Sequence, residues 1–130
     1  GGPAHKQALV DLGWDDPVRF IPYWRDDTGI KVTSLAQPVV ASGWTRGDRN
    51  LLVMVLNDSD GPASCRLAVD FARFGFSGTP VKVHDYGRGG LAYPDSFQES
   101  VPQSEVITPG TPIPLEIGRH SYALLRFCEY

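Results

Sequence analysis

Residues 50–71, NLLVMVLNDSDGPASCRLAVDF, are the part of the sequence that decides the fold class. Segment 50–57 is a nearly continuous apolar run, as is typical of a central strand covered on both faces. Turn residues follow at 57–62, and in 63–71 apolar and polar residues then alternate. Because segment 39–44 also alternates, the pattern predicts three consecutive strands joined as a meander.

Further short strands are predicted on both sides of this stretch. The chain holds 14 Gly and 11 Pro in 130 residues without a repeat, which favours many turns between strands. We therefore predict an all-β domain, an antiparallel β-sandwich of about eight strands with Greek-key or meander connections. The additional strands are expected at 18–24, 30–35, 80–86, 105–108, 113–117 and 121–128. The predicted core comprises Val53, Val55, Leu67, Val69, Phe71, Val83, Leu115, Ile117, Leu125 and Phe127.

The length suits one domain, and we place the sandwich at 18–130. Residues 1–17 are interpreted as a linker or N-terminal extension, because their only helix-like stretch, 4–12, is weak and ends at Gly13. Pro22 cannot donate an amide hydrogen, so segment 18–24 is expected at a sheet edge. The opening residues resemble the interior of a longer chain, which leaves the compartment open, an extracytoplasmic one included.

Charge and hydropathy argue against two classes of partner. The net charge is −3, and the twelve Lys and Arg residues are dispersed, so no nucleic acid partner is expected. The longest apolar run, 51–56, is far shorter than the ~20 residues that span a bilayer, so no membrane partner is expected either.

The two cysteines, Cys65 and Cys128, exclude a disulfide-rich framework and fit no zinc motif. Strand alternation directs Cys65 inward and puts Cys128 out of phase with its inward neighbours. A disulfide between them is therefore disfavoured but left open. Asp58 and Asp60 suggest a calcium loop, but the EF-hand spacing would place leucines at ligand positions, so a hairpin turn is preferred. No metal and no cofactor are expected.

No catalytic constellation is evident in the sequence. His84 and Asp85 are adjacent in a predicted strand and so point to opposite faces. The glycine-rich segment 87–90 is followed by Pro94 rather than by the helix that a phosphate site requires. We expect the isolated chain not to be an enzyme.

Aromatic residues are the main candidates for a binding role, through stacking on a sugar or contact with another domain. The side chains that could offer a flat face to a sugar ring are Trp14, Tyr23, Trp24, Trp44, Tyr86 and Tyr93. Adjacent strand positions face opposite ways, so one of Tyr23 and Trp24 is expected to be exposed, with Asp26, Asp27, Arg88 and Asp95 as possible polar partners. Trp44 is assigned to the core. The candidate binding residues are Trp14, Tyr23, Trp24 and Tyr93.

Three stretches support a family resemblance: LLVMVLNDSDGPASCRLAVDF, PVKVHDY and IPLEIGRHSYALLRF. With their spacing, residues 18–130 resemble the C-terminal antiparallel β-sandwich that follows the (β/α)₈ barrel in multidomain glycoside hydrolases. The resemblance implies a non-catalytic accessory domain that packs against an upstream catalytic domain of the same polypeptide. It also implies a closing hairpin formed by the last two strands. The alternative is a stand-alone carbohydrate-binding module that uses exposed aromatics.

Overall fold

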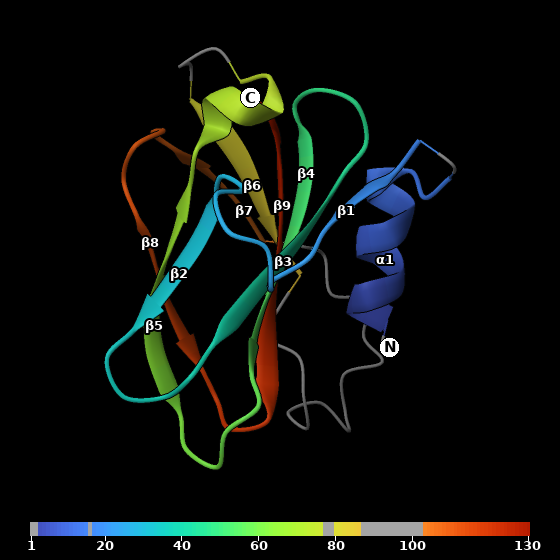
Figure 1. Ribbon diagram of the computed structural model, residues 1–130. Helices are drawn as coiled ribbons and strands as arrows, with labels where there is room; N and C mark the ends of the chain where they lie inside the picture. Colours follow the sequence, from blue (N-terminus) through green and yellow to red (C-terminus); the bar gives the residue numbers. More distant parts are fainter. Residues whose placement is uncertain (1–2, 16, 77–79, 87–102) are drawn as a thin grey trace.

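The computed structural model describes residues 3–15, 17–76, 80–86 and 103–130, with the backbone alone at 3–5 and 103–105. The predicted all-β antiparallel sandwich is confirmed (Figure 1). The described residues form one α-helix, one 3₁₀ turn and nine strands. Their bounds are α1 (Pro3–Leu12), β1 (Arg19–Ile21), β2 (Ile30–Ser34), β3 (Val40–Thr45), β4 (Asn50–Asn57), β5 (Ala63–Val69), η1 (Phe71–Phe74), β6 (Val81–Asp85), β7 (Gln103–Ile107), β8 (Ile113–Ile117) and β9 (Ser121–Glu129).

Two antiparallel sheets make up the sandwich. The larger has the strand order β1-β3-β4-β9-β6-β7, and the smaller has the order β2-β5-β8. Helix α1 lies on the side of the larger sheet that faces away from the smaller one (Figure 1). The larger sheet is therefore packed on both faces, in part by the second sheet and in part by the helix.

The predicted meander is only partly right. Strands β3 and β4 do pair, with Trp44 opposite Leu52. Strand β5, however, lies in the other sheet, where it pairs with β2 and β8. The predicted closing hairpin is wrong for the same reason, since β8 pairs with β5 while β9 pairs with β4 and β6. Alternation tells which face of a strand is buried but does not tell which strand lies beside it.

The core lies between the two sheets. Every predicted core residue is buried there except Val69, which is half-buried and packs against the others. Phe71 and Phe127 meet at the centre edge to face, with ring centroids 5.2 Å apart. Both cysteines are free thiols, Cys65 being buried in this core and Cys128 half-buried on β9.

The outer face of the larger sheet carries a second apolar cluster. Its buried members are Ala8 and Leu12 from α1 together with Leu52, Tyr86 and Leu124. In β4, Leu51, Val53 and Val55 face the core while Leu52 faces the helix, which confirms the predicted central strand. Residues 3–12, part of the segment interpreted as a linker or extension, thus form a helix that covers this sheet.

Strand β1 is an edge strand, as Pro22 predicts. Among the strands described, it pairs only with β3, and it ends at Ile21, one residue before the proline. The chain then turns, with the amide of Arg25 donating to the carbonyl of Pro22 at 3.2 Å. The turn leaves Tyr23 and Trp24 outside the strand.

Candidate functional site

Three aromatic side chains meet at the β1 edge of the larger sheet. Tyr23 and Trp24 are 54% and 67% exposed, and their ring centroids lie 5.2 Å apart at an interplanar angle of 86°. The ring of Phe20, 48% exposed, lies 6.0 Å from that of Trp24 at 70°. The three rings thus form an exposed edge-to-face group.

Two tryptophans extend this group toward the helix. The Trp44 ring lies 5.3 Å from that of Phe20, because the register of β1 and β3 places these residues opposite each other. Trp14, 56% exposed, shares with Trp44 an apolar cleft of about 180 Å³ beside α1. We call the whole set the aromatic patch. It consists of Trp14, Phe20, Tyr23, Trp24 and Trp44.

Two of the sequence-based expectations for these residues need correction. Tyr23 and Trp24 do not face opposite sides of a strand; both lie in the turn after β1 and both are exposed. The cause is Pro22, which ends the strand because it has no amide hydrogen to donate. Trp44 is half-buried, and it packs against the second apolar cluster rather than in the core between the sheets.

The expectation that Tyr86 could stack on a sugar is wrong, because its side chain is fully buried in the second apolar cluster. Tyr93 lies outside the described residues, as do Arg88 and Asp95. The structure therefore brings Trp14, Tyr23 and Trp24 to one surface and leaves Tyr93 unplaced. Phe20 is the member that sequence reasoning missed. Its signal is indirect, because only the pairing of β1 with β3 puts it beside Trp44.

A charged pair fixes the Trp14 end of the patch. Arg46 donates from Nε and Nη2 to the two carboxylate oxygens of Asp15, at 3.0 and 2.8 Å. This hydrogen-bonded guanidinium lowers the pKa of Asp15. Gly13 lies against Arg46 with a φ of +83°, and an added Cβ would approach the arginine side chain to 3.1 Å. The end of α1 is thus tied to the β3–β4 turn, with Trp14 held between them.

A polar groove of about 730 Å³ borders the Tyr23 end of the patch. Arg73 on one wall pairs with Asp27 at 2.7 Å and with Asp70 at 3.4 Å. Arg25 and Asp26 also line the groove, and neither forms an ion pair within the described part of the chain. Two expected polar partners of the aromatic pair, Asp26 and Asp27, therefore do lie beside Tyr23.

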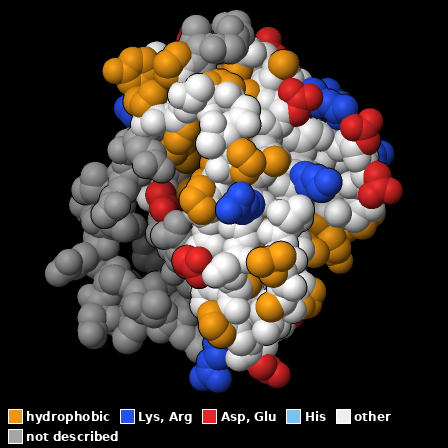
Figure 2. Space-filling view, turned by 90° about the vertical axis from the view of Figure 1, so that its left-hand side faces the viewer, with side chains coloured by type: hydrophobic (Ala, Val, Ile, Leu, Met, Phe, Trp, Pro, Cys, Tyr) orange, Lys and Arg blue, Asp and Glu red, His pale blue; other side chains and the backbone are white. Residues whose placement is uncertain are grey.

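The opposite side of the molecule has a different surface. Figure 2 shows the face that lies to the left in Figure 1, where β2, β5 and β8 lie. Charged side chains of both signs are interspersed there with small, separate groups of hydrophobic ones (Figure 2). The described part of this face thus shows neither a broad apolar area nor a field of a single charge.

The described residues offer few groups of side chains that could bind a metal ion or act in catalysis. Among them, no three or more His, Cys, Asp and Glu side chains gather in a way that could hold a metal ion. His84 lies on β6, and its pKa is lowered by partial burial and by the nearby Arg126 and Lys82.

Within the described residues, no helix has the length and apolar character needed to cross a bilayer. No family model matches the chain, and neither the curated proteins nor the solved structures contain a significant match to it.

Proposed function

We propose that this chain is a non-catalytic accessory domain that packs against another domain of the same polypeptide through the aromatic patch. The observation that carries the proposal is the chain of ring contacts that joins Phe20, Tyr23, Trp24 and Trp44, together with the cleft that Trp44 shares with Trp14. Four of these five side chains are about half exposed or more. Isolated surface hydrophobics are ordinary, whereas a contiguous group is typical of an interaction site.

The orientation of the rings favours a protein partner over a sugar. Trp24 is steeply inclined to both of its neighbours, at 86° to Tyr23 and 70° to Phe20, and only Phe20 and the half-buried Trp44 come closer to parallel, at 33°. The exposed rings therefore offer no continuous flat platform for a row of sugar rings. Protein interfaces, in contrast, accept aromatic side chains in any orientation and surround them with charges. The patch has such a rim in Arg25, Asp26 and the pair of Asp15 with Arg46.

The cleft beside Trp14 supplies a place for an anchoring side chain. Its walls are Leu9, Leu52 and Leu124 together with Trp14 and Trp44. A cavity of about 150 Å³ can hold a benzene molecule, so a cleft of about 180 Å³ can accept one large apolar side chain. Pockets of this kind are where binding energy concentrates in protein interfaces.

The resemblance of residues 18–130 to the sandwich domains of glycoside hydrolases supports a catalytic barrel as the partner. In that arrangement the catalytic carboxylates belong to the barrel, and the sandwich contributes stability and orientation. The parent protein would then act on glycosidic bonds, while the chain described here would have no turnover of its own.

The test compares Trp24→Ser with a matched control, Leu35→Ser, which removes a fully exposed hydrophobic side chain outside the patch. Both variants should leave the unfolding free energy of the isolated chain within about 1 kcal/mol of the original. In the full-length polypeptide, Trp24→Ser alone should lower the melting temperature and increase quenching of tryptophan fluorescence by acrylamide. The proposal fails if Trp24 of the original sequence is as accessible to acrylamide in the full-length polypeptide as in the isolated chain. It also fails if Trp24→Ser unfolds the isolated chain.

The polar groove supports a second candidate, a stand-alone carbohydrate-binding module. Tyr23 offers one aromatic face there. The carboxylate of Asp26 and the guanidinium of Arg25, which form no ion pair with the other described residues, can bond hydroxyl groups. In this case calorimetry with oligosaccharides should detect binding to the isolated chain, and both Tyr23→Ser and Asp26→Asn should abolish it. Binding that survives both changes, or that does not occur, counts against this candidate.

A further inference from the structure

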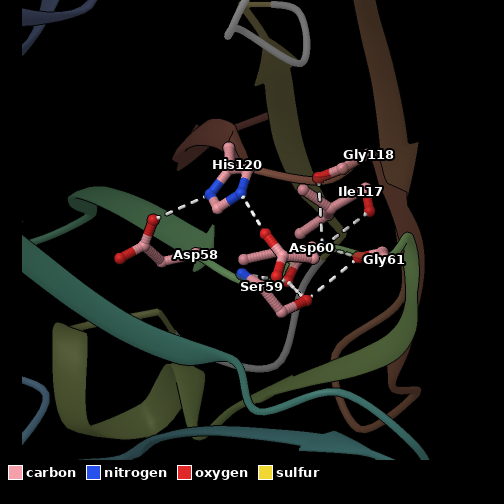
Figure 3. Close-up of polar contacts among 8 residues, drawn as sticks. Asp58, Ser59, Asp60, Gly61, Ile117, Gly118 and His120 are labelled. Carbon is pink, nitrogen blue, oxygen red and sulfur yellow. Dashed lines mark hydrogen bonds and ion pairs between the residues drawn. The ribbon is translucent and has the colours of Figure 1, made fainter.

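Two turns meet at one end of the sandwich, and both carry the chain from one sheet to the other. Residues 58–62 connect β4 to β5, and residues 118–120 connect β8 to β9. Figure 3 shows the two turns side by side. Their contacts decide how the ends of the two sheets are held together.

The side chain of Asn57 connects these two turns through hydrogen bonds. It is fully buried, and the two hydrogens of its Nδ2 are shared among the carbonyls of Gly61, Ile117 and Gly118, at 2.9, 3.1 and 3.0 Å. Its Oδ1 accepts from the amide and the hydroxyl of Ser59 at 3.1 and 2.6 Å. One side chain thus bonds both turns, whatever the pH.

His120 makes the second connection, and its two ring nitrogens meet two different carboxylates. Nδ1 lies 3.2 Å from Oδ1 of Asp58, and Nε2 lies 2.8 Å from Oδ1 of Asp60 (Figure 3). The backbone amide of His120 also donates to the carbonyl of Ser59 at 3.1 Å. Its φ of +49° lies in the left-handed region, which is uncommon for a residue other than glycine.

The protonation state follows from this geometry. A neutral imidazole has one N–H and one lone pair, so it can donate to only one of the two carboxylates. Its unprotonated nitrogen would then face a carboxylate oxygen, lone pair against lone pair. Only the imidazolium donates at both positions, and each bond is then charge-assisted.

We propose that His120 acts as a proton-dependent clamp, which in its imidazolium form ties the β8–β9 turn to the β4–β5 turn through Asp58 and Asp60. Loss of the proton opens one of the two side-chain bonds. The other side-chain bond, the backbone bond from His120 to Ser59 and the bonds of Asn57 then still connect the turns. The clamp does not depend on the proposed function. It rests on charged side chains that lie outside the aromatic patch, whereas the proposed function rests on the apolar contacts of that patch.

The pH dependence has a definite sign. The hydrogen bonds to Asp58 and then to Asp60 raise the pKa of His120 above its ordinary value of 6.5, and these two carboxylates are the charged groups acting on it within the described residues. The stabilisation is therefore complete below pH 6.5 and is lost as the pH rises through the folded-state pKa. All three side chains are exposed, so the effect should weaken in high salt.

The experiment follows the ring nitrogens of His120 by long-range ¹H–¹⁵N NMR while the pH is varied. His120 should titrate above pH 6.5, and the double variant Asp58→Asn/Asp60→Asn should bring its midpoint down toward that value. His84 provides an internal control, since its pKa is lowered and should not respond to the double variant. Urea unfolding between pH 5.5 and 8.5 isolates the clamp by difference, because the lowered pKa of His84 contributes equally to both proteins. The stability of the original chain relative to that of the double variant should fall as the pH rises.

Titration of His120 at or below 6.5 in the original chain would overturn the clamp. An unchanged midpoint in the double variant would overturn it as well. If the double variant does not fold, the titration of the original chain at low and at high salt decides: a midpoint that lies above 6.5 and falls with salt supports the clamp, and any other result overturns it.

Discussion

The two apolar clusters of this domain are held in different ways. The core between the sheets is built from aliphatic and aromatic side chains of both sheets and the η1 turn. The cluster under α1 is smaller and includes Tyr86, whose side chain is fully buried yet carries a hydroxyl. The first cluster depends on the amount of buried area, which is a non-directional contribution. The second combines burial with directional polar bonds.

Those polar bonds join the helix to the sheet. The Tyr86 hydroxyl donates to Oδ2 of Asp11 at 2.7 Å and accepts from Nε of Arg126 at 3.0 Å. Nδ2 of Asn50 donates to the carbonyl of Leu12, at the last turn of α1, at 2.9 Å. Among the described residues, every buried side-chain nitrogen or oxygen has a hydrogen-bond partner. The comparison teaches that one short helix with little contact area is fixed by bonds of defined geometry, whereas the sheets are held by packing.

The largest effect is expected in the core. Leu67 is fully buried in β5, the middle strand of the smaller sheet, and Leu67→Ala should reduce the free energy of unfolding by about 2–5 kcal/mol. The cause is lost burial together with the cavity left behind. Urea unfolding measures it, and an almost unchanged midpoint would show that the packing described for β5 is wrong.

A smaller and local effect is expected under the helix. Tyr86→Phe removes the hydroxyl between Asp11 and Arg126, and it should cost about 1–2 kcal/mol. Hydrogen exchange should quicken in α1 and stay slow in β4. Gln7→Ala is the matched control, because it removes only an exposed bond to the same Asp11. Equal effects of the two variants would contradict the role of the buried hydroxyl.

The same hydroxyl should make the domain sensitive to alkali. Burial, and then the hydrogen bond to Asp11, raise the pKa of Tyr86 to about 12. The neutral side chain therefore stabilises the fold fully below pH 10, and this stabilisation is lost as the pH rises from 10 toward about 12. The difference in absorbance at about 295 nm between the original chain and Tyr86→Phe should have its midpoint near 12. A midpoint near 10 would mean that the hydroxyl is open to water.

The smallest difference concerns backbone protection at the edge of the larger sheet. Strand β1 pairs with one neighbour and β4 with two, so amides 19–21 should exchange much faster than amides 52–56. Hydrogen exchange followed by NMR measures both segments at once. Equal protection would mean that the edge is covered in solution.

Strand positions were predictable because alternation and turn residues act locally. The segments 50–57 and 113–117 are strands with the predicted bounds, and the inward residues were identified by their period of two. The helix over 3–12 was underestimated, because its apolar face consists of little more than Ala8 and Leu12. That face is buried only because it packs against the outer side of β4 and β9.

By itself, the sequence determined the all-β class, the strands and the face that each strand buries, because these properties depend on residues two to eight positions apart. Only the tertiary structure decided that β5 leaves the sheet of β4, that Phe20 meets Trp44, and that His120 meets Asp58 and Asp60. Such contacts join residues from 24 positions apart, as in Phe20 with Trp44, to 62 positions apart, as in His120 with Asp58. They depend on which strands become neighbours, and a local pattern of polar and apolar residues does not specify the pairing of strands.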